Sequence, residues 1–380
     1  MTNESMTSEE RLWSAIRLEK PDRVPVVPTL LSEPAAGLTG LTGAQISSDN
    51  KAIVDAIFKV FDEYGGWDNP YPSAPTPIQM QAAGLYPMKM RIPGVDLPDD
   101  YMFQLAEEEV MTPEDYDKIY EMGYDDFFYE DYLWRITTLK PEDLPGMIDD
   151  VGVALSDFFE QCSRRDRKPF FLGYALHPFF KLSLMRSMVP FTQDLYFNPE
   201  PVERALKKMT EDLIDTQLGI VRDSGIKIWM LCEERASAYF YPPTVFERFW
   251  WPYTKQIVDA FWSEGIVTLF HLDQCWDKNI PYFKELPRGS AILELDSVTD
   301  IFAAKETLRG HLCFHGDVPA AMLTLGKPED VQDYCKKLIN EVGDDGGFIL
   351  GSGCGVPPNV KPENFRALIE TGRNYELSGS

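Results

Sequence analysis

Residues 270–276, FHLDQCW, place a histidine, a carboxylate and a thiol directly after the apolar run IVTLF. His271, Asp273 and Cys275 each carry a side chain that can bind a divalent metal ion. His271 and Asp273 are two residues apart on an extended segment, so their side chains point the same way and can share one ion. The stretch predicts either a metal site at the end of a strand or an ordinary strand followed by a polar loop.

A second candidate ligand is Cys354, which lies between glycines in GSGCG (351–355). Flanking glycines let the backbone turn tightly and present the sulfur to neighbouring strand ends. The sequence has no paired C-x-x-C motif of a structural zinc site, so the ligands would come from separate strands, as in catalytic zinc sites with one open position. We interpret Cys275 as a loop residue that does not bind the metal.

Near-continuous apolar runs alternate with amphipathic helical stretches over the C-terminal half of the chain. Such alternation predicts a parallel sheet covered by helices. The predicted strands are 24–28, 65–69, 168–176, 226–235, 266–273, 291–297, 311–318 and 347–355.

Eight such units favour a closed (β/α)8 TIM barrel, an α/β fold, over a doubly wound sheet. A helix ending at Pro21 forms an N-terminal extension. Residues 70 to about 165 are rich in proline, aromatic residues and acidic clusters, and we interpret them as an insertion after the second strand with short helices. We expect one domain over residues 1–380. No GxGxxG motif follows an early strand, so dinucleotide binding has little support.

Composition excludes several classes of partner. The formal net charge is −25 and the pI is near 4.5, so nucleic acid is a poor partner. No apolar run is long enough to span a membrane, and the polar, acidic start does not resemble a signal peptide. The six cysteines lack the spacing of a disulfide framework. We therefore expect a cytoplasmic protein with reduced thiols.

In a (β/α)8 barrel the chemistry gathers at the C-terminal ends of the strands. There the predicted strands deliver acidic, imidazole, thiol and aromatic groups that converge on one mouth. They include Thr29, Tyr174, His177, Cys232, Glu233, Glu234, His271, Asp273, Glu294, Asp296, His315, Asp317 and Cys354.

Several motifs resemble the uroporphyrinogen decarboxylase superfamily across most of the chain. They are PDRVPV, GIVTLFHLD, ILELDS, GDVPAAMLTLGKPEDV and, most specifically, GSGCGVPPNVKPENFRALIE. The sequence is most similar to the branch of zinc- and corrinoid-dependent methyltransferases. The decarboxylases carry an arginine-rich loop after the first strand, where this chain reads PTLLSEPAAG, so the resemblance does not favour decarboxylation.

The resemblance implies a zinc site. Thiol-methylating members use His-x-Cys on the fifth strand and Cys on the eighth; His271 and Cys354 match, whereas Asp273 stands where the first Cys would be. Members that open aromatic methyl ethers use glutamate and histidine ligands, and Glu233 and Glu234 lie near the matching place. We assign Glu234, His271 and Cys354 to the metal.

Replacing a thiolate by a carboxylate leaves a harder zinc ion, better suited to an ether oxygen. We therefore expect a methyltransferase that demethylates a methoxylated aromatic compound and passes the methyl group to the Co(I) corrinoid of a partner protein. Glu233 or Asp273 would be the catalytic acid. The expected substrate contacts are Tyr174, His177, Trp229, Phe240 and His315. Two alternatives are a methyl-corrinoid:thiol methyltransferase and a metal-free barrel that binds a tetrapyrrole or corrinoid without turnover.

Overall fold

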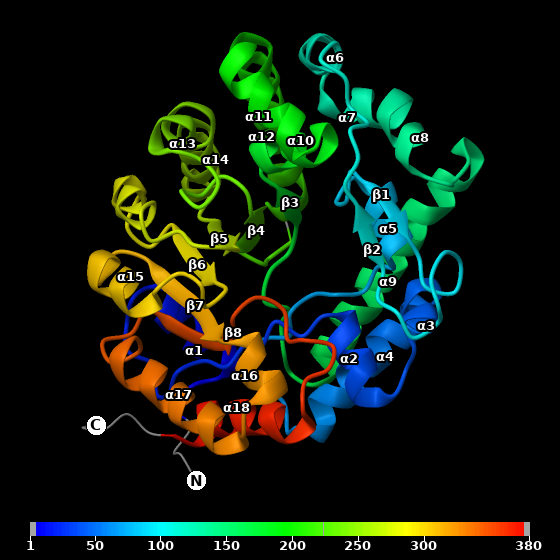
Figure 1. Ribbon diagram of the computed structural model, residues 1–380. Helices are drawn as coiled ribbons and strands as arrows, with labels where there is room; N and C mark the ends of the chain where they lie inside the picture. The colour runs from blue at the N-terminus through cyan, green and yellow to red at the C-terminus, as the bar shows by residue number, and fades with distance from the viewer. Residues whose placement is uncertain (1–4, 223, 376–380) are drawn as a thin grey trace.

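A computed structural model describes residues 5–222 and 224–375 of the chain. Six parallel strands, each hydrogen-bonded to the next in chain order, form the central sheet (Figure 1). They are β3 (Tyr174–Leu176), β4 (Ile228–Glu233), β5 (Val267–Leu272), β6 (Ala291–Leu295), β7 (Cys313–Val318) and β8 (Phe348–Ser352). Each of the six runs predicted from residue 168 onward contains one of these strands.

Two extended segments close the sheet into a ring between β8 and β3. Val26 forms a parallel bridge to Leu350 of β8, and the backbone N–H of Asp68 donates to the carbonyl of Val26 at 2.9 Å. The ring continues at Pro70, whose carbonyl accepts a 2.8 Å hydrogen bond from the N–H of Phe170. Prolines on both sides of the first segment cannot donate to a ladder, so it is not a regular strand. Together these contacts complete the predicted (β/α)8 barrel.

Helices follow the strands and cover the outside of the ring (Figure 1). The helix before β4, α12, runs from Pro199 to Val221. Among the described residues, no helix combines the length and apolar character that crossing a membrane requires. The helices outside the insertion are α1 (Ser8–Ile16), α2 (Ser32–Thr39), α3 (Gly43–Ser48), α4 (Asn50–Glu63), α10 (Pro178–Arg186), α11 (Met188–Phe197), α12 (Pro199–Val221), α13 (Pro243–Phe249), α14 (Trp251–Ser263), η3 (Ile280–Glu285), α15 (Ile301–Leu308), α16 (Ala320–Leu325), α17 (Pro328–Glu341) and α18 (Pro362–Asn374).

The predicted insertion contains short helices, as expected, and also a small antiparallel sheet. Its elements are α5 (Pro77–Ala82), β1 (Lys89–Arg91), β2 (Gln104–Ala106), α6 (Asp115–Met122), α7 (Tyr124–Phe127), η1 (Phe128–Tyr132), α8 (Leu133–Ile136), η2 (Pro141–Asp143) and α9 (Leu144–Arg164). The long helix α9 packs against α4 and α5, so it occupies the place of a barrel helix before β3. The insertion into the (β/α)8 barrel therefore ends before α9, earlier than the predicted end at about residue 165.

Strand residues alternate between the inside of the ring and the outer layer of helices. Met230, Leu269 and Ile292 belong to the inner apolar cluster. Leu12 and Ile16 of α1 belong to the same cluster, so the N-terminal extension packs against the inner layer. This alternation decides which side chains after β4, β5 and β6 can face one another across the mouth.

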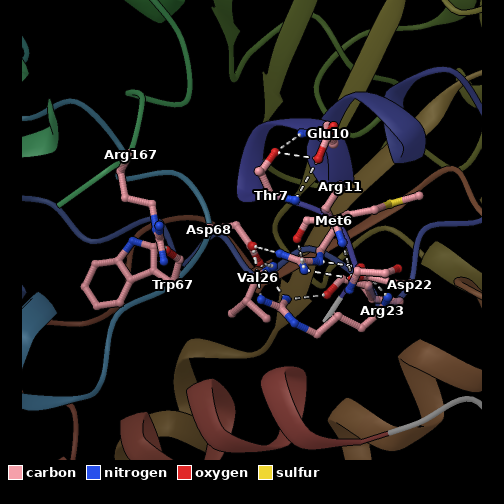
Figure 2. A network of polar contacts seen from close by, with 12 residues as sticks. Met6, Thr7, Glu10, Arg11, Asp22, Arg23, Val26, Trp67, Asp68 and Arg167 are labelled. Carbon is pink, nitrogen blue, oxygen red and sulfur yellow. Dashed lines mark hydrogen bonds and ion pairs between the residues drawn. The ribbon is translucent and has the colours of Figure 1, made fainter. Parts of the chain in front are cut away.

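A buried ion-pair network ties the N-terminal extension to the first two segments (Figure 2). Arg11 and Arg23 donate to the Asp68 carboxylate at 2.6 and 2.7 Å, and the N–H of Val26 donates to it at 2.8 Å. Asp22 accepts a second hydrogen bond from Arg11 at 2.7 Å. Burial raises the pKa of Asp22, but hydrogen bonds from Arg11 and backbone N–H groups outweigh it and lower the pKa to about 2. The network holds the two irregular segments in register.

Candidate metal centre

Three potential ligands from two distant parts of the chain meet at the C-terminal end of the barrel. Sγ of Cys354 lies 3.5 Å from Nε2 of His271 and 3.5 Å from Oδ2 of Asp273. Nε2 of His271 lies 3.4 Å from Oδ1 of Asp273. One ligand atom from each residue lies within 4.8 Å of the others, which is compatible with a shared metal ion. The structure therefore brings Asp273 into the group with the two predicted ligands, His271 and Cys354.

The loop after β8 delivers the sulfur of Cys354 through a strained backbone. Cys354 has a φ of 59°, in the left-handed region that non-glycine residues rarely adopt. The hydroxyl of Ser352 donates to the carbonyl of Cys354 at 2.8 Å and fixes this turn. Gln274 and Ser297, in the loops after β5 and β6, also have positive φ values, both 71°. Strained residues of this kind cluster where surrounding structure holds a site in place.

The glycines of GSGCG also allow a close approach between strands. A Cβ added to Gly351 would lie 2.3 Å from Nε2 of His315 and 2.6 Å from the carbonyl oxygen of Val27. A Cβ added to Gly353 would lie 2.9 Å from the backbone of Asp296. Both glycines are therefore required by packing at the mouth.

The donor set fits a zinc ion. Imidazole nitrogen, thiolate and carboxylate oxygen are the three donor types that zinc accepts, and three ligands leave an open position. Oδ1 of Asp273 is buried and accepts no hydrogen bond, so a polar ligand at this place would satisfy it. The candidate ligands come from two distant strand ends, His271 and Asp273 from the end of β5 and Cys354 from the loop after β8, which is the arrangement of a catalytic rather than a structural zinc site.

Charges around the three ligands perturb their proton affinities. Burial lowers the pKa of His271, but Glu294, Cys354 and Asp273 outweigh it and raise that pKa well above its usual value. Burial raises the pKa of the Cys354 thiol, and His271 offsets this only in part. Because a metal ion binds the deprotonated groups, it must displace these protons.

Below the three ligands, Glu294 of β6 is buried at the centre of a polar cluster. Its Oε1 lies 3.3 Å from Nδ1 of His271 and accepts a 2.8 Å hydrogen bond from the hydroxyl of Thr29. Its Oε2 accepts from the hydroxyl of Tyr71 at 3.3 Å and lies 3.6 Å from Nδ1 of His315. Burial raises the pKa of Glu294, but the two histidines outweigh it, and the net pKa lies well below its usual value.

Glu234 lies beside the three ligands but outside their group. The thiol of Cys232 donates to its carboxylate over 3.7 Å. Burial and the Asp273 carboxylate raise the pKa of Glu234, while His271 and Arg235 oppose them. Glu234 is thus a half-buried carboxylic acid with a raised pKa next to the candidate ligands, although the sequence analysis assigned it to the metal itself.

Glu233 does not face the mouth, contrary to the predicted role as acid in a shared site. Its Oε1 accepts hydrogen bonds from the N–H groups of Arg235 and Ala236 at 2.8 and 3.0 Å. Its Oε2 accepts from the indole N–H of Trp250 at 2.7 Å. Burial raises the pKa of Glu233 to about 8 against these three donors. Glu233, the last residue of β4, points to the same outer side as Leu231, whereas Glu234 follows in the loop after the strand.

Two predicted substrate contacts also lie outside the mouth. Trp229 is fully buried in the outer layer, where its ring stacks on Phe261 at 4.1 Å and its N–H donates to Gln217. His177 is fully buried and caps α10 by accepting from the N–H of Phe179, while its Nε2 meets the hydroxyl of Thr254 at 3.2 Å. Both residues serve packing between the barrel and its helices.

The other three predicted contacts have different surroundings. Tyr174 is partly exposed and packs with Leu176 and Cys232 at the mouth. Phe240 lies in the loop after β4 and is 39% exposed. His315 is fully buried beneath the ligands, where its Nε2 donates to the carbonyl of Val27 at 2.7 Å. Its burial places it behind the site rather than in contact with a substrate.

The sequence analysis missed residues that the insertion and the first segments contribute. Met88 packs in the apolar cluster at the mouth with Cys232. Burial and the charges of Glu33 and Cys232 raise the pKa of Tyr86, so this phenol is also close to the mouth. A tyrosine and a methionine in a proline-rich stretch gave no periodic signal that could have identified them.

Comparison with known proteins connects this geometry to a family. The profile of Uroporphyrinogen decarboxylase (URO-D) matches residues 165–375, which include β3 to β8 and all three ligands. A methylcobamide:CoM methyltransferase MtbA from Methanosarcina acetivorans is 24% identical over 180 residues, covering 47% of this chain and 51% of that protein. A uroporphyrinogen decarboxylase from Dichelobacter nodosus is 25% identical over 251 residues, covering 63% of this chain and 67% of that protein.

The chain thus spans about half the length of its methyltransferase relatives. A solved structure described as a methyltransferase from Methanosarcina mazei has the same fold over nearly the whole chain. The TM-score is 0.71 at 16% identity, with 97% of this chain and 99% of that chain covered. The predicted resemblance is confirmed: the chain belongs to the Uroporphyrinogen decarboxylase (URO-D) family.

Proposed function

We propose that this protein is a zinc- and corrinoid-dependent methyltransferase that demethylates a methoxylated aromatic compound. The methyl group would pass to the Co(I) corrinoid of a partner protein. The observation that carries the proposal is the convergence of His271, Asp273 and Cys354, in which a carboxylate supplies one of the three donors. The names of two relatives, both methylcobamide:CoM methyltransferases, support methyl transfer involving a corrinoid.

The chemistry of an aryl methyl ether explains why this donor set suits it. The phenolate is a poor leaving group, so the ether oxygen needs electrophilic assistance or a proton. Zinc held by one thiolate, one imidazole and one carboxylate would supply Lewis acidity to that oxygen.

The chain's own residues would bind the ring and supply the proton. Glu234 is a carboxylic acid with a raised pKa beside the ligands, so we assign it, in place of Glu233, to protonate the departing phenolate oxygen. Tyr174 and Tyr86 would line the ring-binding side of the mouth. Phe240 is exposed enough to close over a bound ring.

The second candidate is transfer from a methylated corrinoid to a thiol. The names of the two MtbA relatives favour it, because methylcobamide:CoM methyltransferase names CoM as the acceptor. Asp273 stands against it, since two thiolates make zinc more electron-rich and better able to activate a thiol.

The test combines metal analysis with a methyl-transfer assay. Purified protein is expected to contain about one zinc per chain, and Cys354→Ala to lose it. Cys275→Ala is the matched control, because the Cys275 thiol bonds to Asp277 instead of joining the three ligands. The protein is then mixed with reduced cobalamin and a panel of methoxyarenes, and with methylcobalamin and CoM.

Methylation of the corrinoid by any methoxyarene supports the proposal. Consumption of methylcobalamin with CoM alone would replace it by the thiol-acceptor candidate. If the wild-type protein contains no zinc and shows no activity after zinc is added, both methyltransferase candidates are wrong. The remaining alternative is then a metal-free barrel that binds a tetrapyrrole or corrinoid without turnover.

A further inference from the structure

We propose that Glu294 is a positioning residue that fixes the orientation of the His271 imidazole, with Nδ1–H directed at Glu294 and Nε2 directed at the metal. The inference rests on the metal site of the proposed function. It does not depend on which methyl donor or acceptor the protein uses.

The contacts of His271 give the two ring nitrogens different surroundings. Nδ1 faces Oε1 of Glu294 at 3.3 Å, in the interior of the barrel. Nε2 faces Sγ of Cys354 at 3.5 Å and Oδ1 of Asp273 at 3.4 Å. An imidazole that donates from Nδ1 keeps the lone pair of Nε2 free for a metal ion, and a carboxylate acceptor increases the basicity of that lone pair.

Glu294 is itself held from several directions. The hydroxyls of Thr29 and Tyr71 donate to its two oxygens at 2.8 and 3.3 Å. These donors come from the first and second extended segments, whereas His271 and Glu294 belong to β5 and β6. Glu294 is 1% exposed, so water does not compete for these contacts. Its carboxylate therefore cannot turn away from His271 without breaking bonds on the opposite side of the ring.

Burial of this carboxylate needs a functional reason as well as a structural one. A buried charge costs free energy unless hydrogen bonds and opposite charges compensate it. An apolar side chain at position 294 would fill the barrel interior without that cost, as Leu269 and Ile292 do in neighbouring positions. The contact between this carboxylate and His271, a candidate metal ligand, explains why a charged side chain is buried at position 294.

The test compares Glu294→Gln and Glu294→Ala with wild type by zinc competition against a chromogenic chelator. Glu294→Ala is expected to weaken zinc binding by roughly 10- to 100-fold, with a smaller loss for Glu294→Gln because an amide oxygen can still accept. Glu233→Gln is the matched control, since it alters a buried glutamate of β4 that makes no contact with His271. Its zinc affinity is expected to equal that of wild type.

A second measurement, by NMR, reports which nitrogen of the His271 imidazole binds the metal and which carries the proton. The chain has four histidines, so histidine-selective ¹⁵N labelling gives few resonances. In the zinc-loaded wild type, one imidazole should show a metal-bound Nε2 and a slowly exchanging Nδ1–H, and Glu294→Ala should lose that slow exchange. Thr29→Val removes one hydrogen-bond donor to Glu294 with little change of shape, and it is expected to reduce zinc affinity a few-fold. This variant tests the inference if Glu294→Ala does not fold.

Four results would overturn the inference. The first is zinc binding by Glu294→Ala as tight as that of wild type, and the second is zinc binding by His271 through Nδ1. Complete loss of zinc in Glu294→Gln, equal to that in His271→Ala, would make Glu294 a ligand instead. Failure of methyl transfer by a zinc-loaded wild type would contradict the proposed function and leave these measurements intact. Absence of zinc from the wild type would overturn both.

Discussion

Sγ of Cys354 and Nε2 of His271 lie 3.5 Å apart, although 83 residues separate them in the chain. The loop after β8 and the end of β5 meet because both strands belong to one ring and their C-terminal ends share a mouth. Asp273 reaches the same point two residues beyond His271. The candidate metal centre is therefore a product of barrel closure and would not survive partial unfolding of the ring.

Asp273→Cys should convert the donor set to the one that thiol-activating relatives use. We expect zinc binding to tighten by about tenfold, equivalent to about 1.4 kcal/mol, because thiolate is the softer donor. Ether demethylation should fall at the same time. Chelator competition measures the first effect, and cobalt substitution should show stronger sulfur-to-metal absorption. Asp273→Asn is the control: it keeps the shape of the side chain, and it should weaken binding.

Zinc affinity should rise with pH across the neutral range. The pKa of His271 is raised well above its usual value and that of Cys354 is raised as well, so both ligands are protonated in the metal-free protein at neutral pH. Each displaced proton adds about tenfold in affinity per pH unit. Competition assays from pH 6 to 9 should therefore show a continuous increase. A slope that falls from two displaced protons to one near pH 6.5, with Cys354 still releasing its proton above that pH, would show that His271 titrates like an ordinary histidine.

Glu233→Gln should test the structural role of this residue. Burial raises its pKa to about 8, so between pH 4.5 and 8 the folded protein retains a proton that the unfolded chain releases. The contribution of Glu233 to stability is therefore full below pH 4.5 and falls as pH rises to 8, by at most about 1.4 kcal/mol per pH unit. Denaturant titrations at pH 5.5 and 8.5 should show a smaller difference between wild type and variant at the higher pH. An unchanged difference contradicts this account.

Gly351→Ala should destabilise the barrel, because its methyl group would overlap Nε2 of His315 and the carbonyl of Val27. We expect a loss of about 1–3 kcal/mol or more in the free energy of unfolding. Gly219→Ala is the matched control: this position in α12 has no atom within 4 Å of the added methyl group. It should gain about 0.5–1 kcal/mol, since alanine is the better helix former. Thermal unfolding of both variants measures the contrast.

The sequence predicted where the buried strands lie better than it predicted which of their side chains face the inside of the ring. In IVTLFHLD the spacing of His271 and Asp273 was enough to place both on one side of β5. In β4 every residue is buried, so no alternation shows which side chains point inward. Trp229 and Glu233 were both predicted to face the mouth, and both instead share the outer face of β4 with Leu231. Assigning the inward face of β4 to the wrong alternate residues accounts for both errors.

Other features required the three-dimensional structure. Cys354 was predicted to be a ligand because glycines flank it and because its place matches that of a family ligand, but its proximity to His271 depends on closure of the ring. The first segment contains prolines, which cannot donate to a ladder, and the second begins with two glycines, which weaken a strand, so the strand character of both was weak. The position of Tyr86 depends on how the insertion folds back, and that information is absent from local periodicity.

The left-handed backbone at Cys354 has a consequence for how this protein can change over time. Glycine would relax the turn at that position, so selection for thermal stability alone would favour replacing the cysteine. Its retention would mark lineages in which activity is under selection, and its replacement by glycine would mark those in which activity has been lost. Stability-directed engineering of this barrel should accordingly leave position 354 untouched, because the easiest gain there removes the sulfur on which the metal depends.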